Sequence, residues 1–326
     1  MRYLRNDSTD PYFNMAFDEY CLEHQLTDKP LFYLWQNSPS VIIGANQQLH
    51  TETDLSYLQA NGILPVRRVS GGGAVYHDEG NLNYSIVGCS NDLEEHYPEY
   101  AGLMAQALQR LGVPATLSGR NDILVEGRKV SGFAKRVVKG RLMVHGTLMY
   151  DVNLERLAHA LTPSADKLSS KGIASVRSRV CNLKAYLPHL TDITLLRNAL
   201  ERILSNDYAD KEFVLSEEDL RHIRHTGEEK FASWEWIYGR SPQATLSQTA
   251  RLACGSVTVR FNIRQGLIAD CRFEGDFLGG LPIEEVERRL NGLPYDRASL
   301  EKVLEELPIG KYLDGVKPTD LLKIII

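Results

Sequence analysis

Hydrophobic positions in the first third of the chain follow helical and strand spacings in turn. Around Phe13–Cys21 the apolar residues recur at helical intervals, and Asn14 is placed to cap the start of this helix. Two short apolar runs, Leu31–Trp35 and Val41–Gly44, are separated by an Asn-Ser-Pro turn and predict two strands paired with each other. A longer helix is predicted for Pro98–Leu111, where the apolar residues form one stripe. This order of elements is typical of a sheet with helices packed on it.

The middle of the chain predicts an antiparallel meander of three strands. Apolar residues dominate Ile123–Val125, Lys129–Val138 and Arg141–Tyr150, and the two turns between these runs are short and contain glycine. Beyond the meander, the segment Thr162–Asn182 is polar and has no clear period. Such long loops in compact domains are usually functional or disordered. The sequence therefore predicts a long loop between the meander and the helices that follow it.

A second, smaller domain is predicted toward the C-terminus. Val257–Ile263 and Leu267–Phe273 alternate apolar and polar residues around a tight turn, which predicts a hairpin with one apolar face. Two amphipathic helical stretches follow and could cover that face. The stretch Gly239–Ser247 contains Gly, Ser, Pro and Gln and is typical of a linker. We therefore divide the chain into a larger domain, residues 1–243, and a small α+β domain, residues 244–326.

Composition narrows the class of protein. The 326 residues are 43% hydrophobic and 24% charged, as in ordinary globular proteins. The formal net charge of −5 gives no general affinity for nucleic acid or anionic membranes. Neither a signal-peptide pattern nor an apolar window of transmembrane length is found, so a cytoplasmic protein is expected. The five cysteines lack C-x-x-C spacing, which argues against a disulfide framework and a structural zinc site.

The most informative local feature is a glycine-rich turn between two predicted strands. The run Arg67–Gly73 reads Arg-Arg-Val-Ser-Gly-Gly-Gly, so it offers backbone N–H groups beside two guanidinium groups and suits an anion such as phosphate. Neither the P-loop pattern nor the G-x-G-x-x-G dinucleotide fingerprint is present, which disfavours a P-loop ATPase and a nicotinamide dehydrogenase. Taken alone, a tight strand connection explains this turn at least as well.

Three further groups of polar residues could carry chemistry. A hairpin would bring Asn121-Asp122 close to Lys129–Gly132. His145 stands next to a glycine in the last strand of the meander, and Lys171–Arg179 concentrates lysine, arginine and serine in the long loop. Each group also has an ordinary interpretation: turn residues, a hydrogen-bonded core histidine and a solvated basic loop.

Together these motifs resemble the lipoate-protein ligase A family. Five runs occur in the family's order and extend over much of the chain: Arg67–Asn81, Gly119–Asp122, Arg128–Gly132, His145–Leu148 and Lys171–Leu183. The resemblance implies an α+β fold, with the mixed β-sheet core of the biotin and lipoate ligases, similar to class II synthetase cores. Helices are expected to pack on this sheet, and a small C-terminal α+β domain is expected to follow. Biotin ligases, the nearest rival enzymes, lack the Ser-Gly-Gly-Gly run after paired arginines.

The resemblance also implies a two-step reaction. Lipoate and ATP, with Mg²⁺, would form lipoyl-AMP and pyrophosphate, and a lysine of an acceptor protein would then displace AMP. The implied acceptors are apo-lipoyl domains of 2-oxoacid dehydrogenase E2 subunits, the H protein of the glycine cleavage system, or both, and a monomer is expected. Two alternatives stay open. One is a cysteine-dependent octanoyl or lipoyl transferase, for which Cys181 would need a lowered pKa; the other is a non-catalytic lipoate-binding protein.

Individual roles follow from the matched motifs. Lys129 matches the catalytic lysine, which contacts both the lipoate carboxylate and the α-phosphate. Asp122 is the candidate carboxylate for Mg²⁺, and the tunnel for the acyl chain is expected to use Trp35 and Val41–Gly44. The loop Lys171–Arg179 matches the segment that folds over the adenylate. The other residues matched to binding of the nucleotide or the lipoyl chain are Arg68, Ser70, Gly72, Gly73, Ala74, Val75, Tyr76, His77, Asn81, Asn121, Ser131, Gly132, His145 and Thr147.

Overall fold

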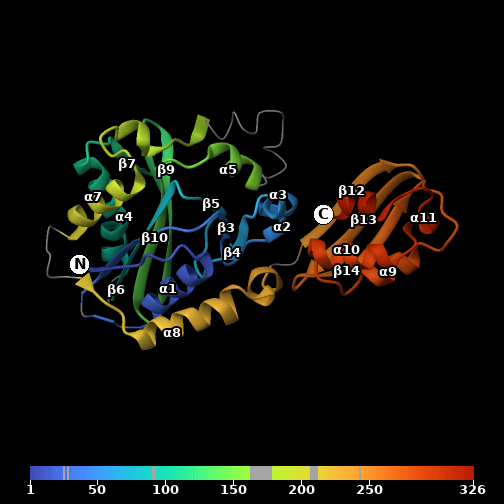
Figure 1. Cartoon of the computed structure of the whole chain (residues 1–326), viewed down its shortest axis with the longest axis horizontal. Helices are drawn as coiled ribbons and strands as arrows, with labels where there is room; N and C mark the ends of the chain where they lie inside the picture. Colours follow the sequence, from blue (N-terminus) through green and yellow to red (C-terminus); the bar gives the residue numbers. More distant parts are fainter. Residues whose placement is uncertain are drawn as a thin grey trace.

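The larger part of the chain folds around a mixed eight-stranded sheet (Figure 1). This computed structural model describes residues 1–24, 26–27, 29–89, 93–119, 121–161, 178–205, 212–241 and 244–326. The strands lie in the order β11–β1–β2–β6–β10–β9–β8–β7. Their bounds are β1 Arg2–Leu4, β2 Leu31–Trp35, β6 Asn81–Cys89, β7 Ala115–Ser118, β8 Asp122–Val125, β9 Arg128–Val138, β10 Arg141–Met149 and β11 Glu212–Phe213.

The predicted meander is confirmed as β8, β9 and β10, and β7 extends it by one strand. Its two turns have positive φ at both central residues: +50° and +76° at Glu126 and Gly127, and +49° and +73° at Lys139 and Gly140. This backbone suits two-residue hairpins because it matches the twist of the strands, and glycine at the second position adopts it without steric cost.

Each face of the large sheet is covered by its own layer. On one face α4 (Leu93–Arg110) and α7 (Ile193–Ser205) pack against apolar side chains of β2, β6, β9 and β10. On the other face lie α1 (Pro11–Glu23), α8 (Glu217–Thr226) and a separate three-stranded sheet in the order β4–β3–β5. The remaining elements of these layers are β3 Ser40–Ile43, β4 Leu64–Arg67, β5 Val75–His77, α2 Leu49–Glu52, α3 Leu55–Ala60, α5 Leu154–Ala160, the 3-10 turn η2 Leu183–Tyr186 and the π-helical turns η4 Gly227–Phe231 and η5 Glu235–Gly239.

No helix among the described residues is long and apolar enough to cross a bilayer.

Three local predictions were wrong. The runs at β2 and β3 do not pair with each other, because β2 lies between β1 and β6 whereas β3 belongs to the second sheet. Asp10, not Asn14, caps α1, and the buried Asn14 amide instead donates to the Gln36 carbonyl at 2.8 Å. Helix α4 begins before Pro98, which lies inside it.

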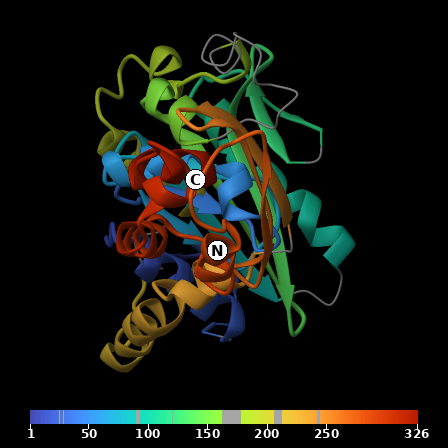
Figure 2. The same ribbon diagram turned by 90° about the vertical axis from the view of Figure 1, so that its right-hand side faces the viewer.

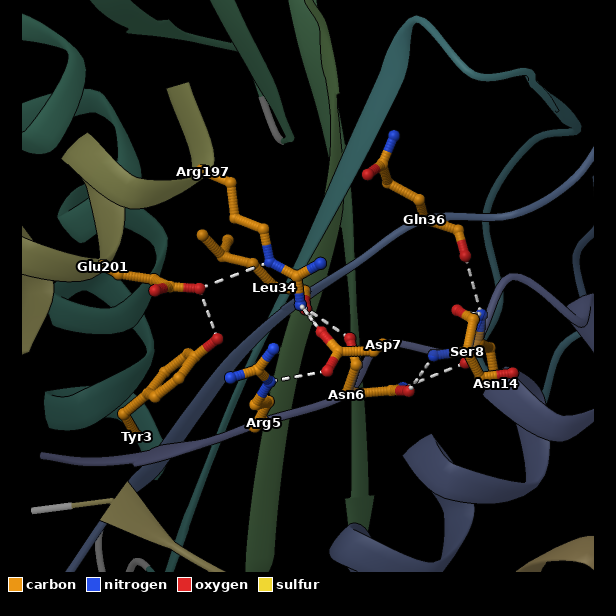
Figure 3. A network of polar contacts seen from close by, with 10 residues as sticks. All are labelled: Tyr3, Arg5, Asn6, Asp7, Ser8, Asn14, Leu34, Gln36, Arg197 and Glu201. Atoms are coloured by element: carbon orange, nitrogen blue, oxygen red, sulfur yellow. Dashed lines mark hydrogen bonds and ion pairs between the residues drawn. The ribbon is translucent and has the colours of Figure 1, made fainter. Parts of the chain in front are cut away.

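A polar network fastens α7 to the large sheet (Figure 3). The Arg197 guanidinium donates to the backbone carbonyls of Asn6 at 2.6 Å and Leu34 at 2.8 Å. It also forms ion pairs with Asp7 at 3.5 Å and Glu201 at 3.3 Å. Leu34 is the penultimate residue of β2, so the network fixes the end of the strand that carries Trp35.

The small domain forms a second body at one end of the long axis of the molecule (orange to red in Figures 1 and 2). Three antiparallel strands, in sequence order, carry four helices around a separate hydrophobic core. The predicted hairpin and its two helices are present. Strand β12 was not predicted, because its sequence, ATLSQTARL, is mostly polar and its first residues, 244–247, fall in the predicted linker. The proposed boundary between residues 243 and 244 stays a prediction, since 242 and 243 lie outside the described residues. The bounds are β12 Ala244–Leu252, β13 Gly255–Arg264, β14 Leu267–Gly275, α9 Glu284–Leu290, α10 Arg297–Glu306, α11 Ile309–Tyr312 and α12 Pro318–Ile325.

The two bodies touch at α2 and α3. Arg297 of the small domain donates to the Ser56 hydroxyl at 3.0 Å. The rings of His50 and Tyr295 meet edge to face, with centroids 4.5 Å apart. Burial, with a smaller contribution from the positive charge of Arg67, lowers the pKa of His50 to about 3. His50 is therefore uncharged in this arrangement at neutral pH.

Candidate active site

A cavity lies between the two sheets and gathers most of the predicted site residues. Its floor comes from β6, β9 and β10 of the large sheet, and its other walls come from the glycine turn, β3 and β5. Of the residues predicted for the acyl tunnel, Trp35 and Ile42 line the cavity, whereas Val41, Ile43 and Gly44 do not. The other predicted residues along its surface are Arg68, Gly72, Gly73, Ala74, Val75, His77, Asn121, Lys129, Gly132, His145 and Thr147.

Arg68 supports the glycine turn from behind. Its Nε donates to the Ser70 hydroxyl at 3.0 Å, and its terminal nitrogens donate to the carbonyls of Ile42 (3.0 Å), Gly71 (2.7 Å) and Gly73 (2.9 Å). The side chain is 7% exposed, and burial lowers the pKa of the guanidinium to about 10. It is therefore still charged at neutral pH, and it places a fixed positive charge behind the turn.

The turn can approach β3 only because Gly44 lacks a side chain. A Cβ on Gly44 would lie 2.2 Å from the carbonyl oxygen of Gly72, a distance that no real Cβ contact reaches. The Ala45 N–H donates to the Ser70 carbonyl at 2.9 Å and closes the same contact. The position of the turn against β3 therefore depends on Gly44, a glycine outside the turn itself.

Arg67 connects the glycine turn to a distant part of the chain. Its fully buried guanidinium donates to carbonyls of residues 44–47 at 2.7–3.3 Å. It also donates to the carbonyls of Trp236 and Ile237 and to the Ser241 hydroxyl at 2.9 Å. Burial lowers its pKa to about 10. Arg67 thus has a structural role, and its donors are committed to protein acceptors.

Lys129 and Asp122 form an ion pair on adjacent strands at the edge of the cavity. Lys129 Nζ lies 2.7 Å from Asp122 Oδ1, and the two side chains are 36% and 35% exposed. A Cβ on Gly132 would lie 2.7 Å from Lys129 Nζ, so the ammonium rests directly over this glycine. The predicted hairpin therefore does bring these motifs together. The ammonium is partly solvated and can reach a ligand in the cavity.

A chain of hydrogen bonds links the glycine turn to α1. Ser70 Oγ lies 2.6 Å from His145 Nε2, and His145 Nδ1 lies 2.7 Å from Asp18 Oδ2. The order of groups is that of a hydrolase triad. However, Ser70 is fully buried, accepts a hydrogen bond from Arg68 and is not part of the cavity surface. The chain therefore positions the turn over the sheet, and Ser70 is not placed to act as a nucleophile.

Besides Asp122, which pairs with Lys129 at the edge of the cavity, four predicted residues lie near the cavity without lining it. Ser70 acts through His145 and Arg68, and Asn81 donates to Asn83 Oδ1 at 2.9 Å. The Tyr76 side chain packs in the core behind β5, and Ser131 is fully buried. Any contact of these residues with a ligand would have to be indirect or through the backbone.

The cavity also contains residues that the sequence analysis did not select. Met15 and Asn83 line it, and Asp18 lies just behind His145. A pattern in the sequence could have identified Asn83. Asn81, Asn83 and Ser85 are polar at alternate positions of an otherwise apolar strand, which places three polar groups on one face. Asp18, one acid in the apolar stripe of the first helix, carried a weaker signal.

Most of the predicted basic loop, residues 171–177, lies outside the described part of the chain. The chain re-enters the described part beside the site. Val180 forms a bridge with Lys129, and the Cys181 N–H donates to the Lys129 carbonyl at 3.0 Å. The residues that follow the loop are therefore hydrogen-bonded to the backbone of β9 at Lys129.

Cys181 does not have the environment of a nucleophile. It is 6% exposed, and burial raises the pKa of its thiol, which outweighs the opposite effect of the Arg128 charge. None of the described residues that line the cavity is a cysteine. The geometry therefore disfavours a cysteine-dependent transferase.

Known proteins share both parts of this architecture. The family model of the lipoyl protein ligase A/B catalytic domain matches residues 10–205, and that of the bacterial lipoate protein ligase C-terminus matches residues 241–325. Lipoate-protein ligase LplJ of Bacillus subtilis is 39% identical over 330 residues and covers 100% of both chains.

Two solved structures share the fold over most of the chain. One is from a study of a bipartite lipoate protein ligase and its E2 lipoyl domain from Thermoplasma acidophilum. It has a TM-score of 0.66 and 30% identity, over 72% of this chain and 95% of that chain. A lipoate-protein ligase A bound with ATP has a TM-score of 0.63 and 29% identity, over 72% of this chain and 97% of that chain.

Proposed function

The chain belongs to the lipoate-protein ligase family, and from this premise we propose that it activates lipoate with ATP and transfers the lipoyl group to a protein lysine. In the first step a carboxylate oxygen of lipoate attacks the α-phosphorus, and the bond to pyrophosphate breaks. In the second step the acceptor amine attacks the acyl carbon, and AMP leaves with the former carboxylate oxygen. The amine loses one proton in this step. Both reactants of the first step are anions, so the site must neutralise and align them.

The position of Lys129 is the observation that supports this proposal most. Its ammonium stands over Gly132 at the edge of a cavity that carries the glycine turn on one wall and apolar side chains farther in. One cation there can contact a carboxylate entering from the apolar side and a phosphate held by the turn. Asp122 orients the ammonium in the absence of ligand.

Magnesium fits the residues present if the nucleotide supplies most of its ligands. The described residues contain no group of three or more His, Cys, Asp or Glu that could hold a metal ion by itself. Mg²⁺ commonly uses one or two carboxylates, phosphate oxygens and waters, so Asp122 would suffice as the protein ligand. Bound with ATP, the ion would screen the negative charge of the phosphates.

The proposed acceptors are apo-lipoyl domains of 2-oxoacid dehydrogenase E2 subunits, the H protein of the glycine cleavage system, or both. The study of the Thermoplasma relative concerns a ligase and its E2 lipoyl domain, which supports the first class. For this chain, acceptor panels followed by mass spectrometry would rank the two classes.

The first experiment is pyrophosphate release in the presence of ATP, Mg²⁺ and lipoate, followed by transfer to an apo-lipoyl domain. We expect Lys129→Ala to lower lipoate-dependent pyrophosphate release about a hundredfold to a thousandfold, because a charge-assisted contact to both reactants is lost. Lys135→Ala is the matched control, since Lys135 is exposed on the same strand, and it should leave the rate unchanged.

Three outcomes would contradict the proposal. Near-normal pyrophosphate release by Lys129→Ala would remove the role of the ammonium. Acyl transfer without ATP would indicate a transferase, and lipoate binding with neither reaction would indicate a binding protein. Circular dichroism of both variants would show that the fold is intact.

A further inference from the structure

Two buried hydrogen-bond donors face the cavity without a partner. His77 and Asn83 both line it and are 2% and 1% exposed. His77 Nε2 and Asn83 Nδ2 find no hydrogen-bond partner among the described residues. An unsatisfied buried donor is costly, and native structures usually supply an acceptor from protein, water or ligand. Here the donors lie on the surface of the cavity, so a bound molecule can provide the acceptor.

Hydrogen bonds behind His77 determine which of its ring nitrogens is the donor. The Asn14 amide nitrogen donates to the Gln36 carbonyl, as Figure 3 shows, and to Asn37 Oδ1 at 2.8 Å. Asn37 Nδ2 must therefore be the group that faces His77 Nδ1, at 3.0 Å, and it donates to that nitrogen. The proton of the neutral imidazole is then on Nε2. Burial, together with the charge of Arg68, lowers the pKa of His77 to about 3, which keeps this ring neutral.

The Asn83 amide has one end hydrogen-bonded to its neighbour on the strand and the other end without a partner among the described residues. Its Oδ1 accepts a hydrogen bond from Asn81 Nδ2 at 2.9 Å. The Nδ2 group is thus the free end of the side chain. The two donors come from different sheets, His77 from β5 and Asn83 from β6, and both lie beside Trp35: the Trp35 and His77 ring centroids are 6.1 Å apart, and Trp35 pairs with Asn83 in register.

The register of the large sheet shows how far Asn83 and Trp35 lie from Gly132, the residue under the Lys129 ammonium. A line of residues crosses adjacent strands from Gly132, under Lys129 Nζ, to Thr147, Asn83 and Trp35. Neighbouring strands are about 4.8 Å apart, so Asn83 lies about 10 Å and Trp35 about 14 Å from Gly132. An extended lipoate whose carboxylate meets Lys129 carries its two sulfur atoms, on the sixth and eighth carbons, to the region between Asn83 and Trp35.

We propose that His77 Nε2–H and Asn83 Nδ2 form a polar subsite that binds the sulfur atoms of the dithiolane ring and so selects a sulfur-bearing acyl group over a purely hydrocarbon one. This inference rests on the proposed function and specifies its substrate. Sulfur is a weak acceptor, but it partly satisfies both donors. A hydrocarbon end would leave them unpaired and dehydrated, and a site with buried polar groups rejects such an analogue for that reason.

A carbocyclic analogue separates the effect of sulfur from that of shape. In 5-cyclopentylpentanoate a cyclopentane ring replaces the dithiolane ring, so the molecule keeps the length and ring of lipoate without an acceptor. The measured quantity is the ratio of kcat/KM for lipoate to kcat/KM for the analogue, in the pyrophosphate assay, with octanoate as a third acid. For the wild type we expect a ratio of about ten or more.

Variants of the two residues test whether the donors cause this ratio. His77→Phe and Asn83→Leu keep similar volumes and remove the donors, and each should lower the ratio at least threefold. His77→Gln keeps an N–H donor and should retain more of the ratio than His77→Phe. His159→Phe is the matched control, because His159 is exposed on α5, and its ratio should equal that of the wild type. Loss of packing alone would lower kcat/KM for both acids and leave the ratio unchanged.

The outcomes separate this inference from the proposed function. If the wild type releases pyrophosphate with none of the acids, the proposed function fails. If it activates lipoate but shows a ratio near one, or if His77→Phe and Asn83→Leu both keep the wild-type ratio, only the sulfur subsite is overturned. Should His77→Phe not fold, as judged by its thermal unfolding, the wild-type ratio and the Asn83→Leu and His77→Gln variants decide the question.

Discussion

Asp18 determines the arrangement of several side chains although it does not line the cavity. The carboxylate is 1% exposed, and Oδ1 accepts hydrogen bonds from Tyr33 at 2.7 Å and Ser85 at 2.8 Å. Oδ2 faces His145 Nδ1 at 2.7 Å. Since all of these partners can donate, a group that only accepts is required at this position. Helical periodicity predicted the apolar face of α1 but not this use of one acid within it.

Asp18→Asn is expected to lower the free energy of unfolding by about 2–3 kcal/mol, because an amide places two donors against groups that also donate. Urea unfolding followed by circular dichroism would measure the change. Glu23→Gln is the matched control, since Glu23 is exposed in the last turn of the same helix, and its effect should stay within about 0.5 kcal/mol. Equal stability of the two variants would show that Asp18 does not organise the site.

At the scale of elements, the conformation of the glycine turn depends on free space beside residue 44 as well as on the turn's own residues. Its carbonyl at Gly72 occupies the place where a side chain of residue 44 would be. The second sheet, to which Gly44 and the turn are both attached, thereby sets the width of the cavity on the side opposite β6 and β10.

Gly44→Ala should displace the turn and lower the stability by about 1–3 kcal/mol through overpacking. We also expect a higher KM for ATP, because the turn is the proposed phosphate-binding element. Thermal unfolding and the pyrophosphate assay would test both effects. The matched control is Gly102→Ala in α4, where the new methyl group has room at 3.4 Å from a flexible glutamine end and should stabilise the helix slightly. An unchanged KM for ATP in Gly44→Ala would argue against a phosphate at the turn.

Local elements were predicted best where turn chemistry and periodicity agree. The meander is one case, since glycine follows the first residue in both two-residue turns. The pairing of β2 with β3 was wrong because an apolar run shows that a strand is buried without showing which sheet contains it. Strand β12 was missed because, at the edge of the small sheet, it needs few apolar residues.

At the scale of the whole molecule, the site depends on a register that crosses five strands. Neighbouring positions in the line from Trp35 to Asp122 come from β2, β6, β10, β9 and β8, which are far apart in the sequence. The family motifs identified one end of this line, Asp122 with Lys129, and the glycine turn on the facing wall of the cavity. Asn83, in the middle, matched no motif, and its position could not be predicted without the order of the strands.

The contact between the two bodies predicts a dependence of stability on pH. His50 is uncharged when docked, with a pKa of about 3 against about 6.5 in the unfolded chain. The unfolded state therefore binds a proton as pH falls below about 6.5 while the folded state does not, so this contribution to stability is complete above pH 6.5 and decreases toward pH 3. The pKa of His77 is also lowered, to about 3, so His77 contributes to the pH dependence of stability in the same direction.

His50→Phe should keep the ring contact with Tyr295 and remove one titrating group. We expect equal or greater stability than wild type at pH 8, because the ring nitrogens of His50 have no partner among the described residues. Between pH 7 and pH 5 the wild type should lose up to about 2 kcal/mol more than the variant. Urea unfolding across this range measures the difference, and parallel pH profiles would contradict the prediction.

The guanidinium of Arg67 joins three stretches of chain: β4 itself, the residues after β3, and the segment Trp236–Ser241 that precedes the small domain. Loss of one of these acceptors would leave part of a buried charge unpaired, which costs free energy. We therefore expect the turn proposed to hold the nucleotide and the chain leading to the second body to open or stay closed together. A local opening at either end should then disturb the other end even when no ligand is bound.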